Sequence, residues 1–147
     1  KGSLRLFGNE VNQNVNFRIA YAPQTPEIFN ASIKDNILLG RNGDYVEASK
    51  KALLYDEIIA MPNGFLEMLS HTQSNLSGGQ QKRLMIARCI VNQPNVIILD
   101  DAFSSIDNDM ALKIIDNLPK DALIFIITNN QEIIEKMDHV INMDEVC

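Results

Sequence analysis

The 147-residue sequence has the length of one domain, and its 46% hydrophobic and 22% charged residues are ordinary for a globular protein, which excludes disordered and fibrous classes. Its net charge of −6 comes without a run of three basic residues, so extensive binding to nucleic-acid phosphates is not expected. No apolar stretch approaches the roughly 20 residues of a membrane-spanning helix, and two isolated cysteines are typical of a reducing compartment.

The first half of the chain is predicted to hold two strands followed by short helices. Alternating residues predict a strand over 3–7, and the apolar run 19–22 predicts a second strand, which Pro23 ends. Ser32 and Asp44 are suitable N-caps for helices over 33–38 and 45–54, and another helix is expected over 56–60.

The second half alternates helices with apolar strands. A long helix is predicted to begin after Ser77 and to end before the Gln93-Pro94 pair. Beyond it, the pattern predicts buried strands over 96–99 and 123–128, a third strand over 140–143, and helices over 106–118 and 131–137. This order of elements indicates an α/β fold with a parallel sheet built from βαβ units.

Ser77, Gly78 and Gly79 stand directly before the predicted long helix. Ser77 is a natural N-cap, and two residues without side chains let another molecule approach the backbone N–H groups, where the helix dipole favours an anion. The segment is therefore a candidate phosphate-binding site. An ordinary turn before a helix would use the same residues.

Asp100 and Asp101 follow the predicted strand 96–99. Ligands of parallel sheets bind at the carboxyl ends of the strands, where a carboxylate can hold Mg²⁺ directly or through water. The alternative is an aspartate that ends the strand and caps the next turn.

Five segments in order resemble the nucleotide-binding domain of ATP-binding cassette (ABC) transporters across nearly the whole chain. Residues 76–80 are identical to the family's LSGGQ signature, and residues 96–100 are similar to its Walker B strand. Residues 102–107 stand where the family has its D-loop, and Gln24 resembles the Q-loop glutamine. Residues 29–37 are similar to the stretch that follows the Q-loop in exporters.

This resemblance implies an α/β fold of the P-loop NTPase type, in which a helical subdomain is inserted into a parallel sheet that is incomplete at both ends. Residues 1–24 and 93–147 would form part of the ATPase core, and residues 25–92 would form the helical subdomain. Two such domains would meet head to tail at the cytoplasmic face of a membrane. The helical subdomain would contact a transmembrane domain, and the transporter would export peptides or other substrates.

The resemblance also implies a role for each site residue, with ATP and Mg²⁺ as ligands. Asp100 and Gln24 would serve Mg²⁺ and the attacking water. Asp101 would polarise that water, and Asn129 would lie near the γ-phosphate. The residues that would bind ATP held by the partner domain are Ser77, Gly78, Gly79 and Gln80.

Three of the sequence's departures from the family pattern concern hydrolysis. No lysine follows a glycine, so the phosphate loop GxxxxGK[ST] is absent, and we expect that loop to lie upstream of Lys1 in a longer parent protein. Asp101 is one methylene shorter than the family's catalytic glutamate. Asn129 stands in place of a histidine and cannot carry a proton. We therefore expect the chain alone to bind ATP weakly and not to hydrolyse it.

Two further functions fit parts of the sequence. Because both catalytic positions differ at once, the domain could be degenerate and use ATP binding as a dimerisation switch with little hydrolysis. Chromosome-structuring ABC ATPases also share the signature, but they lack the exporter-like stretch 29–37 and carry a long coiled coil before the signature.

Overall fold

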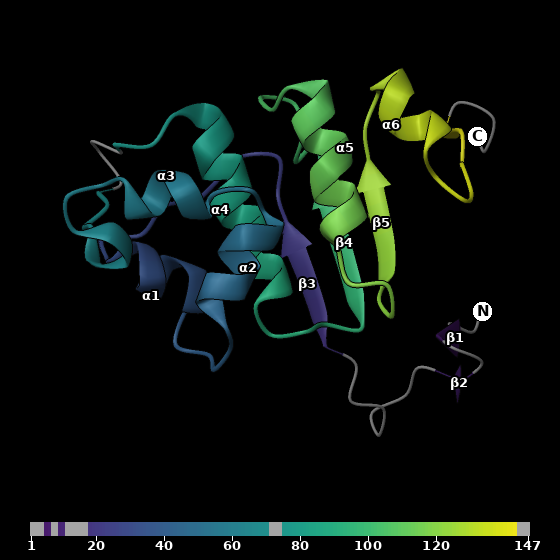
Figure 1. The fold of residues 1–147 in the computed structure, drawn as a ribbon. Coiled ribbons are helices and arrows are strands. Elements are labelled where there is room, and N and C mark those ends of the chain that lie inside the picture. Colours follow the sequence, from purple (N-terminus) through teal and green to yellow (C-terminus); the bar gives the residue numbers. More distant parts are fainter. Residues whose placement is uncertain (1–4, 7–8, 11–17, 71–74, 144–147) are drawn as a thin grey trace.

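A computed structural model of the chain describes residues 5–6, 9–10, 18–70 and 75–143. Its centre is a parallel sheet with β4 in the middle, and β4 is paired in register with a strand on either side. The strands of this sheet are β3 (Ile19–Ala22), β4 (Val96–Asp100) and β5 (Leu123–Ile127), and Figure 1 shows them side by side. The short strands β1 (Arg5–Leu6) and β2 (Asn9–Glu10) form a separate antiparallel pair.

The long helix α4 (Gly78–Ile90) lies between this sheet and a group of short helices (Figure 1). The group consists of α1 (Ile33–Leu38), α2 (Tyr45–Lys51), α3 (Tyr55–Ile59) and the 3₁₀ turn η1 (Gly64–Leu66). The first two begin at the predicted caps, because Ser32 accepts from the N–H of Asp35 and Asp44 accepts from that of Glu47. These caps are local, so the sequence predicts them well.

Two helices complete the described part of the fold. The helix α5 (Asn108–Asn117) connects β4 to β5, and α6 (Gln131–Glu135) follows β5. Fully buried side chains of β4, α4 and α5 belong to one continuous core, among them Ile97, Leu99, Leu84, Ile86 and Ile114. The result is the predicted α/β fold with a parallel sheet.

Residues 140–143 do not form the third strand that their apolar pattern predicts. Val140, Ile141 and Met143 are exposed, and Ile141 lines an open pocket beside β5 together with Phe125. A strand requires backbone hydrogen bonds to a neighbour, which an apolar alternation alone does not supply.

The strand β5 is exposed on one face, whereas its apolar run predicted burial. Phe125 and Ile127 are 45% and 55% exposed, and Ile19 and Tyr21 of β3 are 59% and 54% exposed. The parallel register places these side chains on the same face of the sheet. No element in the described ranges covers that face, and an apolar run does not reveal how many faces are covered.

Four helices differ from their predicted bounds, including α3, which spans 55–59 and not 56–60, and α6, which ends at Glu135 and not at residue 137. The other two differences have local reasons. The helix α2 ends at Lys51, before residue 54, because Leu53 takes a left-handed backbone conformation with φ 52°. The helix α5 begins at Asn108, after residue 106, because the side chain of Asp107 accepts a hydrogen bond from the N–H of Met110 at 2.9 Å.

Candidate functional site

A capping box closes the N-terminus of α4. The Ser77 hydroxyl accepts a hydrogen bond from the N–H of Gln80 at 3.3 Å, and the side-chain oxygen of Gln80 accepts one from the N–H of Ser77 at 2.7 Å. Gly78 and Gly79 stand between these two residues. Their N–H groups are the other two that a helix start leaves without an intrahelical partner, so they can receive an anion.

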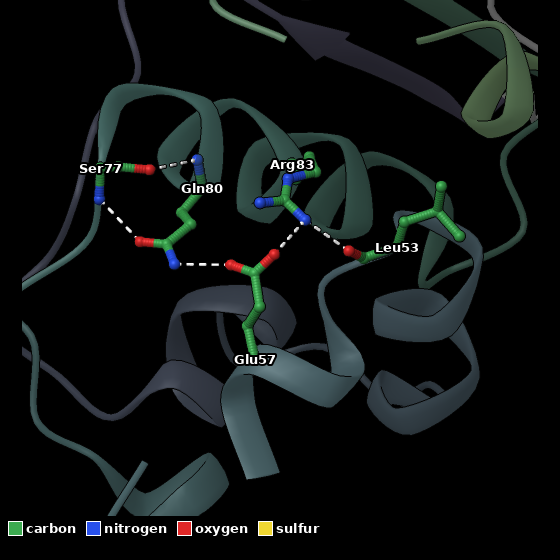
Figure 2. A network of polar contacts seen from close by, with 5 residues as sticks. All are labelled: Leu53, Glu57, Ser77, Gln80 and Arg83. Carbon is green, nitrogen blue, oxygen red and sulfur yellow. Dashed lines mark hydrogen bonds and ion pairs between the residues drawn. The ribbon is translucent and has the colours of Figure 1, made fainter. Parts of the chain in front are cut away.

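An acidic residue of α3 holds Gln80 in place, as Figure 2 shows. The Gln80 side-chain amide donates to Glu57 at 2.5 Å, and the second carboxylate oxygen of Glu57 lies 2.8 Å from the buried guanidinium of Arg83. Arg83 also donates to the carbonyl of Leu53. Both ends of the Gln80 side chain are therefore engaged within the chain.

The contacts of Glu57 lower the pKa of its carboxyl group. Partial burial, the largest single influence, would raise that pKa by disfavouring the charged form. Hydrogen bonds from Arg83 and Gln80, together with the positive charge of Arg83, outweigh burial, so the net shift is downward. Glu57 therefore remains ionised and keeps both contacts at neutral pH.

Gly78 and Gly79 differ in how closely the loop after β4 approaches them. A Cβ atom on Gly79 would lie 2.6 Å from the carbonyl oxygen of Ser105, a distance that real Cβ atoms do not reach. A Cβ atom on Gly78 would lie 3.8 Å from the Ser105 side chain, an ordinary contact. Gly79 is thus required by the chain's own packing, whereas Gly78 is not.

Three of the predicted site residues lie at the carboxyl-end edge of the sheet. Gln24 comes two residues after β3, Asp100 is the last residue of β4, and Asn129 comes two residues after β5. Because the strands are parallel, these ends meet at one edge. The side chains of Gln24 and Asn129 are exposed there.

The carboxylate of Asp100 has a partner that the sequence did not indicate. The hydroxyl of Tyr21, on the neighbouring strand β3, donates to Asp100 Oδ2 at 2.9 Å. This hydrogen bond is the main cause of a raised pKa for the Tyr21 hydroxyl, with smaller contributions from burial and from the negative charge of Asp100. The contact fixes the orientation of the Asp100 carboxylate.

The main chain of Asp101 is held on both sides in a left-handed conformation with φ 49°. Its N–H donates to the carbonyl of Ile127 at 2.9 Å, and its own carbonyl accepts from the N–H and hydroxyl of Ser104 at 3.4 and 3.1 Å. The same carbonyl accepts a hydrogen bond from the Nζ atom of Lys82 at 2.7 Å. Lys82, which belongs to α4, therefore helps to hold the main chain of Asp101.

The oxygen atoms at this edge suit Mg²⁺. Asp100 offers a carboxylate and Gln24 offers an amide oxygen, and Mg²⁺ in nucleotide sites is bound through one or two carboxylates together with phosphates and water. Within the described ranges, no group of three or more His, Cys, Asp or Glu side chains could enclose a metal ion. The chain's donors fit a metal that shares its coordination with a bound phosphate.

Sequence reasoning missed the supporting residues Tyr21, Glu57 and Lys82. Lys82 and Arg83 did carry a signal, since two basic residues within a buried helix need acceptors inside the protein. Tyr21 carried a weaker one, a polar hydroxyl in an apolar strand. Glu57 carried none, because its partner Gln80 is 23 residues away.

Comparison with known proteins identifies the family. Residues 1–104 match the family model described as ABC transporter. The chain belongs to the ABC transporter family. Its family assignment from the signature, Walker B and Q-loop segments is thereby confirmed.

Individual relatives support the same assignment to the ABC family. The ABC-type transporter fsqE of Aspergillus fumigatus is 32% identical over 97% of this chain, and so is a probable ABC transporter ATP-binding/permease protein of Haemophilus influenzae. The alignments cover 13% and 28% of those two proteins. The chain therefore spans well under two thirds of these relatives.

A solved ABC structure has the same fold. A bacterial Atm1-family ABC exporter with ATP bound aligns with a TM-score of 0.75 and 26% identity, covering 82% of this chain and 22% of the exporter chain. The chain is an exporter-like nucleotide-binding domain. No helix in its described ranges is long and apolar enough to cross a membrane.

Proposed function

We propose that the chain closes over ATP held by a second nucleotide-binding domain of an ABC exporter, and that it supports ATP hydrolysis in that head-to-tail dimer. The observation that carries this proposal is the glycine pair inside the capping box of α4. There a helix N-terminus offers two N–H groups beside residues without side chains. A phosphate group is the anion that a member of this family would bring to them.

The residues of the signature divide into two roles under this proposal. The Ser77 hydroxyl uses its oxygen to cap the helix and keeps its O–H to donate to a phosphate oxygen. Gly78 and Gly79 donate their backbone N–H groups. Gln80, whose side chain is hydrogen-bonded to Ser77 and Glu57, positions the loop, and the second N–H of its side-chain amide would donate to the nucleotide.

The residues at the sheet edge would serve the nucleotide of the chain's own half of the dimer. Asp100 and Gln24 would hold Mg²⁺, which when bound supplies positive charge to neutralise the phosphates. Asp101 would accept a hydrogen bond from the attacking water and orient it. Asn129 would donate its amide to the γ-phosphate. A phosphate loop, which the sequence does not contain, would cradle the triphosphate.

The proposed partners follow from the placement of the helices. The helices α1, α2 and α3 lie together on the side of α4 opposite the sheet (Figure 1). This supports a division into a helical subdomain, residues 25–92, and a core of residues 1–24 and 93–147. The helical part would contact a transmembrane domain, and the chain would then lie at the cytoplasmic face of a membrane.

The proposal is tested by comparing two helix caps in the full-length protein. Ser77→Ala and Asp44→Ala each remove a side-chain acceptor at a helix start, at a cost of about 1 kcal/mol of stability. Loss of a hydrogen bond to a charged phosphate costs roughly 1.5–3 kcal/mol more. We therefore expect Ser77→Ala to lower ATP turnover by about tenfold or more, and Asp44→Ala to leave it within about twofold, in a phosphate-release assay.

The conservative variant Ser77→Thr serves as the control for the hydroxyl, because it keeps both the cap and the O–H donor. It should retain most of the turnover. Equal turnover in Ser77→Ala and Asp44→Ala would show that Ser77 acts only as a cap, and the proposed function would then be wrong.

A second function, an ATP-dependent dimerisation switch with little hydrolysis, is favoured by Asp101 and Asn129 together. Asp101 is shorter than glutamate, and a displacement of roughly 1 Å can cost on the order of a hundredfold in rate. Asn129 lacks a titratable ring. A domain that only binds ATP would tolerate both changes.

Repair of both positions in the full-length protein separates the two functions. If the protein hydrolyses ATP slowly, Asp101→Glu and Asn129→His should each raise phosphate release, and the double variant should exceed the sum of the single effects, since groups that act as a unit are not additive. If the unmodified protein releases phosphate no faster than an Asp100→Asn variant, the switch function is supported instead.

A further inference from the structure

Lys82 is a buried cation that contacts main-chain oxygen atoms. Its side chain extends from α4 and is 4% exposed. Its Nζ atom donates to the carbonyl of Gln24 at 2.5 Å and to that of Asp101 at 2.7 Å. Within the described ranges, no carboxylate forms an ion pair with it. Burial of an ammonium group is costly unless acceptors replace water. A buried lysine is therefore possible at this position because these two carbonyls accept its hydrogen bonds.

The two carbonyls belong to the loops that follow neighbouring strands. Gln24 lies 58 residues before Lys82 in the sequence, and Asp101 lies 19 residues after it. Both are residues to which the proposed function gives a role in hydrolysis. One side chain of α4 therefore joins the helix that carries the signature to both loops.

Asp101 needs external contacts to keep its backbone conformation. A left-handed φ of 49° is unfavourable for a residue with a side chain and persists only where the surroundings impose it. The N–H of Asp101 is held by Ile127, and its carbonyl is held by Ser104 and Lys82. Of the three residues that hold Asp101, Lys82 is the one that belongs to α4.

Gly79 and Lys82 present the same face of α4 to the loop that begins at Asp101. They are three residues apart, which places them on one side of a helix. Lys82 contacts the start of the loop, and the carbonyl of Ser105 lies against Gly79. The loop is thus hydrogen-bonded to α4 at Lys82 and packs closely against it at Gly79.

We propose that Lys82 is a positioning residue for hydrolysis: it holds the main chains of Asp101 and Gln24 against α4, so that the Asp101 side chain faces the attacking water. This rests on the proposed function, which gives Asp101 its role. Lys82 acts through these two residues and touches neither ATP nor the water.

The test uses Lys82→Met in the full-length protein, a variant of similar length without a donor. We expect kcat for ATP hydrolysis to fall by roughly tenfold to a hundredfold, with KM for ATP within about twofold, because positioning of the water changes and nucleotide binding does not. In the nucleotide-free protein, hydrogen exchange at the amide of Ser104, which donates to the Asp101 carbonyl, should become faster.

Arg41→Met is the matched control. Arg41 also donates to two main-chain carbonyls, those of Leu38 and Arg88, at 3.1 Å each. Leu38 belongs to α1, and Arg88 lies toward the other end of α4. Arg41→Met should leave kcat within about twofold and leave exchange at Ser104 unchanged.

The outcomes separate the two proposals. If the unmodified protein does not hydrolyse ATP, the proposed function fails, and unchanged exchange at Ser104 in Lys82→Met would then overturn the role of Lys82 independently. A folded Lys82→Met protein with unchanged kcat, or with unchanged exchange at Ser104, also overturns it. If Lys82→Met does not fold, Lys82→Ala, which also removes the donor, is judged by the same two measurements.

Discussion

Three basic side chains of α4 donate to carbonyls of other segments. Lys82 reaches Gln24 and Asp101, Arg83 reaches Leu53, and Arg88 reaches Asn36 and Glu27. Carbonyls in loops have no ladder partner, and carbonyls in the last turn of a helix, such as that of Asn36, have no intrahelical partner, so both need donors. These basic residues of α4 therefore donate their hydrogen bonds to carbonyls within the domain.

Cys89 lies among these basic residues and is predicted to be unreactive in the folded chain. Burial raises the pKa of its thiol to about 11, and the nearby charges of Arg88 and Arg41 oppose that rise only in part. At pH 8 roughly one thiol in a thousand would be ionised. Iodoacetamide should therefore label Cys89 slowly in the native protein and readily in denaturant, as measured by peptide mass spectrometry.

Rapid native labelling of Cys89 would contradict its burial. The Cys89→Ala variant provides a complementary control, since a small buried hydrophobe replaced by alanine loses few contacts. That variant should fold normally.

Because α4 packs against the loop 101–105, the two signature glycines differ in how well they tolerate replacement by alanine. Gly79→Ala would place its Cβ 2.6 Å from the Ser105 carbonyl, and displacement of the backbone should lower stability by about 1–3 kcal/mol. Gly78→Ala has room within the chain and should keep or slightly raise stability, since alanine favours helix. Thermal unfolding of both variants measures this difference.

Activity should not follow stability in this pair. Gly78→Ala places a methyl group where the proposed phosphate approaches, so ATP turnover in the full-length protein should fall although the protein is as stable as before. Full turnover in Gly78→Ala would contradict phosphate binding at this glycine. Equal stability of the two variants would contradict the close packing of Gly79.

Local interactions explain why the elements were predictable and their mutual contacts were not. The caps at Ser32, Asp44 and Ser77 act within three residues, so each is visible as a short pattern. The contacts of Glu57 with Gln80 join residues far apart in the sequence. A single sequence contains no periodicity or spacing that relates such positions.

For the whole molecule, the alternation of helices and strands was sufficient to predict a parallel sheet. It was not sufficient to predict which faces of that sheet are covered by other elements. The run 123–127 is apolar throughout, and this pattern indicated that the strand predicted over 123–128 is buried. Phe125 and Ile127 are nevertheless exposed, and Ile19 and Tyr21 extend the same open face. Residues 140–143 were predicted as a strand from their apolar pattern. That pattern does not reveal whether the segment pairs with a neighbouring strand.

The basic contacts of α4 also limit how this family member can change length during evolution. A helix turns by about 100° per residue, so one residue inserted between Arg83 and Arg88 would rotate Arg88 away from the carbonyls of Asn36 and Glu27 while Lys82 kept its own. A deletion there would do the same in the opposite sense. Among homologues, the spacing from the signature to Arg88 should therefore stay constant, while insertions and deletions should collect in loops that make no such contacts.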